Sequence, residues 1–223
     1  MVSIAFTTHG LYGGEVHADC IAAVERAARL CESLGHHVEE AAPDLDGERF
    51  IDHFLVFWSH TPRRLIDGLT AQRGAPPPRD AFEPWTWGLA ERFHGLPDDA
   101  LPRALAFAAD AAQRMQAFHA SFDLWLTPVL ASPALRIGEL DGSTPYAQAL
   151  EEAITYVAFT PIANATGQPS MSVPLHWNDG GLPIGALFTG QVGAEATLFA
   201  LAKQLETAQP WASRWPAVSA LPG

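Results

Sequence analysis

The sequence predicts an α/β fold in which a mixed β-sheet is flanked by helices, and three observations support that prediction. A β-α-β pattern opens the chain, with a strand at 3–7, a helical segment and a second strand at 37–41. Such a unit places parallel strands together through a right-handed crossover. Near the end, strands at 171–175 and 183–189 flank a hairpin turn. The residues between these two patterns have mostly helical periodicity.

The first predicted helix carries apolar side chains at helical spacing and ends at Gly35, which suits a helix C-terminus. Cys20 and Cys31 both lie on it. Eleven residues of helix separate the two by about 16 Å, which is too far for a disulfide. We therefore expect two buried free thiols.

The middle of the chain is predicted to be helical, with a first helix at 49–59 that ends before Pro62, because proline cannot donate a helical hydrogen bond. The proline-rich stretch 71–79 is predicted to be an exposed loop. Two further helices are expected at about 81–94 and 98–120.

Aromatic residues concentrate in the first part of this helical region, and two interpretations stay open. They either form the packing between helices or line an apolar substrate channel. The residues concerned are Phe54, Phe57, Trp58, Phe82, Trp85, Trp87 and Phe93.

The last third of the chain begins with a central strand at 122–126, which ends in Thr127-Pro128. A loop at 129–144 and a helix at about 146–164 follow. Gly167 suits the left-handed position that ends a helix, and Pro169 prevents continuation. After the hairpin, a final amphipathic helix is expected at about 195–207.

Composition bounds the class of protein. The chain has 223 residues with 48% hydrophobic and 17% charged, which excludes a disordered chain, and residues 1–223 are predicted to form a single domain. A formal net charge of −12 disfavours a nucleic-acid partner. The sequence has no basic run, no secretory signal and no apolar stretch of about 20 residues. We therefore expect a cytoplasmic protein that does not associate with a membrane.

The most informative segment runs from Phe159 to Leu175 and reads Phe-Thr-Pro-Ile-Ala-Asn-Ala-Thr-Gly-Gln-Pro-Ser-Met-Ser-Val-Pro-Leu. It is followed by Gly181-Leu182-Pro183-Ile184-Gly185 and by a helix that starts at Glu195. This ordered string resembles the C-terminal signature of the amidase signature family, serine amidases with a Ser-Ser-Lys triad. Ile4 to Thr8 and Leu124 to Pro128 resemble further segments of that family. Nearly the whole chain is covered, but it corresponds to the C-terminal half of a usual member.

The resemblance implies the C-terminal part of the amidase signature fold and hydrolysis of carboxylic amide C–N bonds. It also implies that the catalytic residues come from a Gly-Ser-rich part that this sequence does not contain. The single lysine, Lys203, falls on the polar face of the last predicted helix. A lysine base must be desolvated and beside its serine. No catalytic residue is therefore predicted in this chain.

Other chemistry has little support in the sequence. No Gly-x-Ser-x-Gly elbow occurs, and Ser170 and Ser172 are expected to share one strand face and pack against backbone. No His-Glu-x-x-His motif occurs, and His53 and His60 would lie about 10 Å apart on one helix. We predict neither a metal site nor a cofactor.

By the family pattern, five residues are predicted to form a wall of the substrate cleft: Thr127, Pro128, Phe159, Thr160 and Asn164. The expected partners are an N-terminal amidase half or a second copy of the chain, with a small-molecule amide bound only in the complete enzyme. Two alternatives stay open, namely a noncatalytic binding or regulatory protein and one subunit of a split amidase.

Overall fold

A five-stranded mixed sheet organises the computed structural model, which describes residues 1–215. The strands are β1 (Ser3–Phe6), β2 (His37–Glu40), β3 (Leu124–Pro128), β4 (Ser170–Trp177) and β5 (Pro183–Gly190). Their order across the sheet is β2-β1-β3-β5-β4. β1 is parallel to both β2 and β3, while β5 is antiparallel to β3 and to β4. The predicted α/β class, the β-α-β unit and the hairpin are therefore confirmed.

Seven α-helices and one short 3-10 helix surround the sheet in the described part of the chain. They are α1 (Ala18–Ser33), α2 (Gly47–Arg73), η1 (Arg79–Ala81), α3 (Pro84–His94), α4 (Ala100–Phe118), α5 (Tyr146–Tyr156), α6 (Pro161–Thr166) and α7 (Glu195–Ala208).

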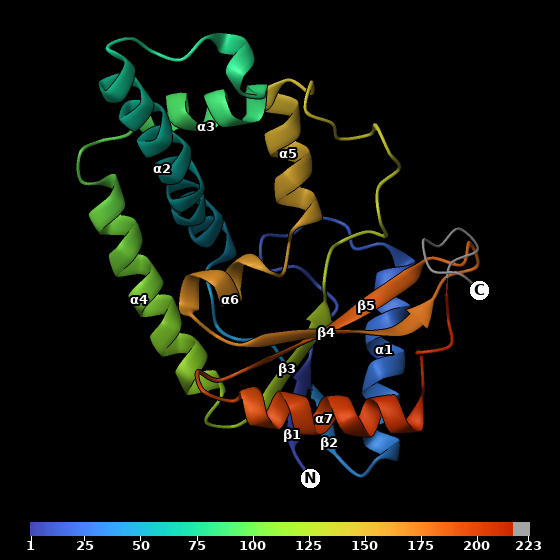
Figure 1. Cartoon of the computed structure of the whole chain (residues 1–223). Coiled ribbons are helices and arrows are strands. Elements are labelled where there is room, and N and C mark those ends of the chain that lie inside the picture. The colour runs from blue at the N-terminus through green and yellow to red at the C-terminus, as the bar shows by residue number, and fades with distance from the viewer. Residues whose placement is uncertain (216–223) are drawn as a thin grey trace.

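Helices cover both faces of the sheet. Successive strand residues point to opposite sides, and both sides carry apolar side chains that the helices bury. Ile4 faces the core that α1 and α7 close, whereas its neighbour Ala5 faces the core that α2, α4 and α6 close. Figure 1 shows α1 and α7 beside the strands and the long helices α2 and α4 extending away from them. Phe188 is fully buried in the first core, and Phe50 is 1% exposed in the second.

The aromatic residues of the helical region pack the helices against one another. The ring centroids of Phe54 and Trp58 lie 5.2 Å apart, and those of Trp58 and Trp85 lie 5.7 Å apart. Trp85 in turn lies 6.0 Å from Tyr146. Edge-to-face pairs at these distances stabilise beyond the area they bury. The cluster thus joins α2, α3 and α5, as the packing interpretation expects.

Two helix predictions were wrong, and proline is involved in both. Helix α2 continues through Pro62 to Arg73 and so covers the first three residues of the predicted loop at 71–79. The lost hydrogen bond is offset because α2 packs along α3 and α4. The expected helix at 146–164 is instead two helices, since α5 ends at Tyr156 and α6 begins at Pro161. Proline is favoured at the first helical position, so it starts a helix better than it continues one.

Two local predictions were correct. Gly167 has φ 74°, the left-handed conformation that ends α6, and its amide donates to the carbonyl of Ala163. Cys20 and Cys31 are buried free thiols. Within residues 1–215, no helix is long and apolar enough to cross a membrane.

Candidate functional site

The carboxyl ends of β1 and β3 are the place where this topology opens a crevice. The chain leaves β1 toward α1, which packs on one face of the sheet, and it leaves β3 toward α6, which packs on the other face. Neighbouring parallel strands whose connections diverge in this way leave a gap between their loops. Ligands of open α/β sheets bind in such gaps.

Main-chain hydrogen bonds join three segments around this crevice. The amide of Thr7, just past β1, donates to the carbonyl of Leu126 at 3.1 Å. The amide of His17 donates to Ala131 at 2.8 Å, and the amide of Ala131 donates to Tyr156 at 3.0 Å. The loop after β1, the loop after β3 and the end of α5 are therefore held together, which fixes the walls of the crevice.

These walls enclose an open cavity of about 1080 Å³. Four of its lining residues are carboxylates: Glu15, Glu139, Glu151 and Glu152. No arginine or lysine stands among the lining residues of the described chain. The polar character of the cavity also comes from His17, Ser132, Gln148, Thr155 and Tyr156.

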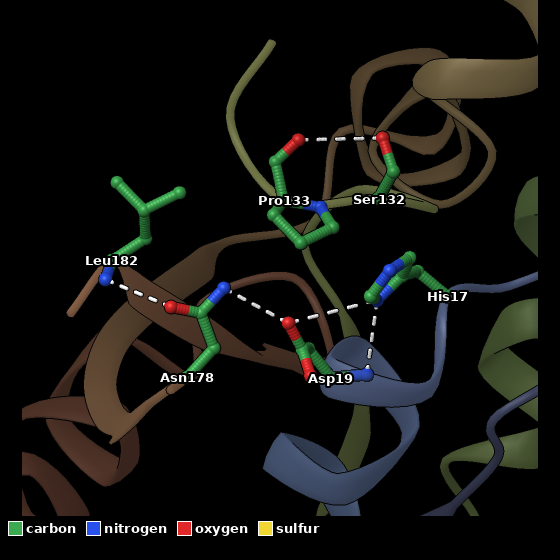
Figure 2. Close-up of polar contacts among 6 residues, drawn as sticks. All are labelled: His17, Asp19, Ser132, Pro133, Asn178 and Leu182. Atoms are coloured by element: carbon green, nitrogen blue, oxygen red, sulfur yellow. Dashed lines mark hydrogen bonds and ion pairs between the residues drawn. The ribbon is translucent and has the colours of Figure 1, made fainter. Parts of the chain in front are cut away.

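A chain of polar contacts ties the first turn of α1 to the β4–β5 hairpin (Figure 2). The His17 imidazole caps α1 by accepting from the amide of Asp19 at 3.1 Å. The Asp19 carboxylate accepts from Nδ2 of Asn178 at 2.9 Å, and Oδ1 of Asn178 accepts from the amide of Leu182 at 2.9 Å. A carboxylate in the first turn of a helix is also favoured by the helix dipole. The network orients the loop that carries His17 into the cavity wall.

We expect the Asp19–Asn178 bond to couple these two elements energetically. In a double-mutant cycle of Asp19→Ala and Asn178→Ala, the coupling energy should be about 1 kcal/mol, because a charged acceptor is paired with an amide donor. Urea denaturation of the two single variants and the double variant measures it. Strictly additive losses would mean that the contact contributes nothing in solution.

A second cavity of about 170 Å³ adjoins the first, since Ser132 and Tyr156 line both. Its other walls are mostly apolar and include Val129, Ile184 and Gly185. Cys20 also lines it, but burial, with a smaller contribution from the Asp19 charge, raises the pKa of the Cys20 thiol to about 11. The thiol is therefore protonated at neutral pH and is a poor nucleophile.

The five residues predicted for the cleft wall lie at the end of β3 and on residues 159–164, which lead into α6. Thr127 and Pro128 end β3 and are buried, and the Thr127 hydroxyl donates to the Pro128 carbonyl at 2.9 Å. Phe159 is 3% exposed and packs with Ala131 of the loop after β3. Thr160 precedes α6 and is half-buried, whereas Asn164 is exposed on α6.

None of these five residues lines either of the two cavities just described. Their role as a cleft wall stays a prediction. The residues that do line the larger cavity, such as Glu15 and Ser132, were missed by the motif search. Their position just beyond two parallel strands was the available signal.

The serines and the lysine singled out by the sequence lie apart. Lys203 is exposed on α7, as predicted. Ser170 and Ser172 share one face of β4, as predicted, and both residues are largely exposed, although the Ser172 hydroxyl lies against the main chain of Gly185 on β5. The Ser170 hydroxyl lies 2.8 Å from that of Thr189 on β5. Within residues 1–215, no group of three or more metal-ligating side chains is placed to hold a metal ion.

Comparison with known proteins identifies the family. The family model described as Amidase matches residues 2–199. A relative from Mycobacterium leprae (strain TN), named "Putative amidase AmiC", is 36% identical over 187 residues, which are 84% of this chain and 40% of the relative. The 6-aminohexanoate-cyclic-dimer hydrolase of Pseudomonas sp. (strain NK87) is 29% identical over 226 residues, which are 96% of this chain and 45% of the hydrolase.

Solved structures agree with the sequence comparison. A 6-aminohexanoate cyclic dimer hydrolase complexed with substrate matches 97% of this chain and 47% of its own chain, with TM-score 0.84 and 26% identity. A bacterial aryl acylamidase of the amidase signature family shares the fold with TM-score 0.72. The chain therefore spans less than half the length of these relatives. Because the family model matches most of its residues, this chain belongs to the amidase signature family of amidases.

Proposed function

We propose that this chain is the C-terminal portion of an amidase-family hydrolase that acts on carboxylic amide C–N bonds. In this proposal the Ser-Ser-Lys catalytic part is contributed by polypeptide outside the chain. The observation that carries it is partial coverage: the chain matches the amidase family model over residues 2–199, yet its alignment with the AmiC relative covers only 40% of that relative.

The positions of the lysine and the serines also support a catalytic part that lies outside this chain. Acyl transfer through a serine needs a base within hydrogen-bond reach of the nucleophile. The only lysine of the sequence is exposed on α7, and the two β4 serines have no base beside them among the described residues. What this chain offers is the crevice at the carboxyl ends of β1 and β3, with its two adjoining cavities.

The proposed partners follow from this reading. An N-terminal amidase half would complete the enzyme, and a small-molecule amide would bind only to the completed site. The chain would then be either one part of a longer protein or one subunit of a split amidase. A noncatalytic binding protein built on the same fold is the second candidate, favoured by the main-chain hydrogen bonds that hold the loops of the crevice together.

An activity assay with and without a partner tests the proposal. The purified chain alone should hydrolyse none of a panel of aryl and aliphatic amides, because neither Ser170 nor Ser172 has a base beside it among the described residues. The panel should include 6-aminohexanoate cyclic dimer, since a hydrolase of that compound is 29% identical to this chain. Co-expression with the part of AmiC that lies outside its match should restore turnover.

Controls separate the outcomes. Lys203→Ala should leave the restored activity unchanged, because that side chain is exposed on α7. Turnover by the chain alone that is lost in Ser170→Ala or Ser172→Ala would show that the nucleophile lies in this chain. Failure of every partner combination, together with tight amide binding by the chain alone, would favour the binding-protein candidate.

A further inference from the structure

A cavity between helices α2 and α4 lies apart from the crevice. It has a volume of about 340 Å³ and shares no lining residue with either of the two cavities of the crevice. Helix α2 contributes two of its lining residues and α4 contributes four. We call it the α2–α4 pocket, and its lining residues are Arg49, His53, Arg103, Ala106, Phe107 and Asp110.

The positive charge of this pocket is poorly compensated. Arg49 forms no ion pair with any of the described residues, and Arg103 lies 3.9 Å from Asp99 in a pair of exposed side chains. The carboxylate of the lining, that of Asp110, already accepts from Nε of Arg114 at 2.8 Å. Two guanidinium groups of the lining are therefore available to an anion, although the whole chain has a formal net charge of −12.

The Phe107 ring holds two side chains of the pocket in place. The guanidinium carbon of Arg49 lies 5.2 Å from the centroid of that ring, which is an attractive cation–π contact. The imidazole of His53 stacks on the same ring, with the two centroids 4.5 Å apart and the planes inclined by 27°. A ligand that enters the pocket would therefore meet side chains that are partly ordered, which lowers the entropic cost of binding.

His53 responds to the charge of the two arginines. Burial, with smaller contributions from the charges of Arg49 and Arg103, lowers the pKa of His53, and the charge of Asp52 opposes them. With Asp110 on α4, these are the charged groups around the imidazole from both helices. The imidazole is therefore neutral at pH 7 in the free chain. An anion in the pocket would offset the charge of the arginines and raise the pKa of His53.

We infer that the α2–α4 pocket binds a small organic carboxylate, held by the guanidinium groups of Arg49 and Arg103 with its apolar part against Phe107. A planar guanidinium group matches a carboxylate through two parallel hydrogen bonds. The ring of Phe107 and the methyl group of Ala106 favour an anion that carries an apolar group over an inorganic ion. The volume of the pocket also falls in the range of small-molecule sites. The inference does not depend on the proposed function.

The experiment is a titration of the purified chain with sodium benzoate, in which sodium chloride keeps the ionic strength constant. The imidazole NMR signal of His53, identified by its absence from the spectrum of His53→Gln, reports binding. Benzoate should shift this signal in a saturable way, whereas benzyl alcohol, which has the same ring without the charge, and inorganic phosphate should bind at least tenfold more weakly.

Two variants of α2 separate the pocket from the general charge of the surface. Arg49→Gln should weaken benzoate binding by about tenfold or more, because it removes a charged donor. Arg63→Gln is the matched control, since Arg63 lies on the same helix outside the pocket and is paired with Asp67 at 2.7 Å. It should bind benzoate as the wild type does. Circular dichroism establishes that each variant is folded.

The pH dependence of binding provides a second measurement. A bound anion raises the pKa of His53, so the protonated imidazole must in turn bind the anion more tightly. Affinity should therefore be highest below the pKa of His53 in the free chain, and it should fall as the pH rises through the pKa of the complex. The titration stays above about pH 5, where benzoate is ionised. His53→Gln should still bind benzoate but without this dependence on pH.

Each outcome decides for or against the pocket. Saturable binding of benzoate that Arg49→Gln weakens and Arg63→Gln leaves intact would support the inference. No saturable shift of the His53 signal, or equal affinities of Arg49→Gln and the wild type, would overturn it. So would tighter binding of phosphate than of benzoate, which would mark a general anion site, or equal binding of benzyl alcohol, which would mark an apolar one.

Discussion

Replacing Gly47 with alanine is expected to destabilise the fold strongly, unlike the same replacement at Gly68, the other glycine of α2. A β-carbon at Gly47 would lie 1.7 Å from the carbonyl oxygen of Leu11, which belongs to the main chain of the loop after β1. Backbone cannot move aside as a flexible side chain can. We expect a loss of about 3 kcal/mol or more, at the upper end of the range for overpacking.

Gly68 provides the control for this prediction, because it lies in the same helix and an added β-carbon there meets nothing within 4 Å. Gly68→Ala should raise stability by about 0.5–1 kcal/mol through helix propensity. Thermal denaturation followed at 222 nm compares both variants with the wild type. For Gly47→Ala the midpoint should fall by roughly 6–12 °C. An unchanged midpoint would show that α2 does not approach the loop so closely.

Truncating Phe188 to alanine is expected to have an effect of similar size for a different reason. Phe188 has no exposed surface and lies on β5 in the core that α1 and α7 close. Its loss would remove buried apolar area and leave a cavity, at a cost of about 3–5 kcal/mol. Urea denaturation measures the change in the free energy of unfolding.

Phe199 on α7 is the matched control, since it carries the same side chain but is 74% exposed. Phe199→Ala should change stability by less than about 0.5 kcal/mol. Equal losses at the two positions would contradict the packing of α7 against the sheet. A large loss at Phe199 alone would indicate that its surface is covered by another molecule in solution.

Local signals in the sequence were sufficient to predict the strands of the sheet and most of the helix ends. The β-α-β unit and the hairpin depend on short-range spacing, and Gly167 takes the left-handed conformation that its position required. Pro62 shows the limit of such signals. Its intrinsic cost in a helix is real, but packing between α2, α3 and α4 outweighs it, and tertiary packing cannot be read from a window of residues.

The candidate site was harder to predict because its walls are distant in sequence. Glu15 and Tyr156 line one cavity only because β1 and β3 are neighbours and the Ala131 main chain joins their loops. The motif that identified the family named residues at the strand end, before α6 and on α6, and none of them lines either cavity. A motif marks where a family is alike. The lining of a cavity depends on loops, which vary more.

The pairing of β1 with β3 has a consequence for how the protein is made. Ser3 bonds to Asp123 across 120 residues of chain, and Ile4 is the partner of Leu124. A ribosome that adds about 5–20 residues per second needs roughly 6–24 s to cover that distance. During that interval β2 is the only one of its two neighbouring strands that can pair with β1, and α1 is already available to cover its apolar face. Variants that weaken the β-α-β unit should therefore reduce the yield of protein per cell before they change any property of the folded molecule.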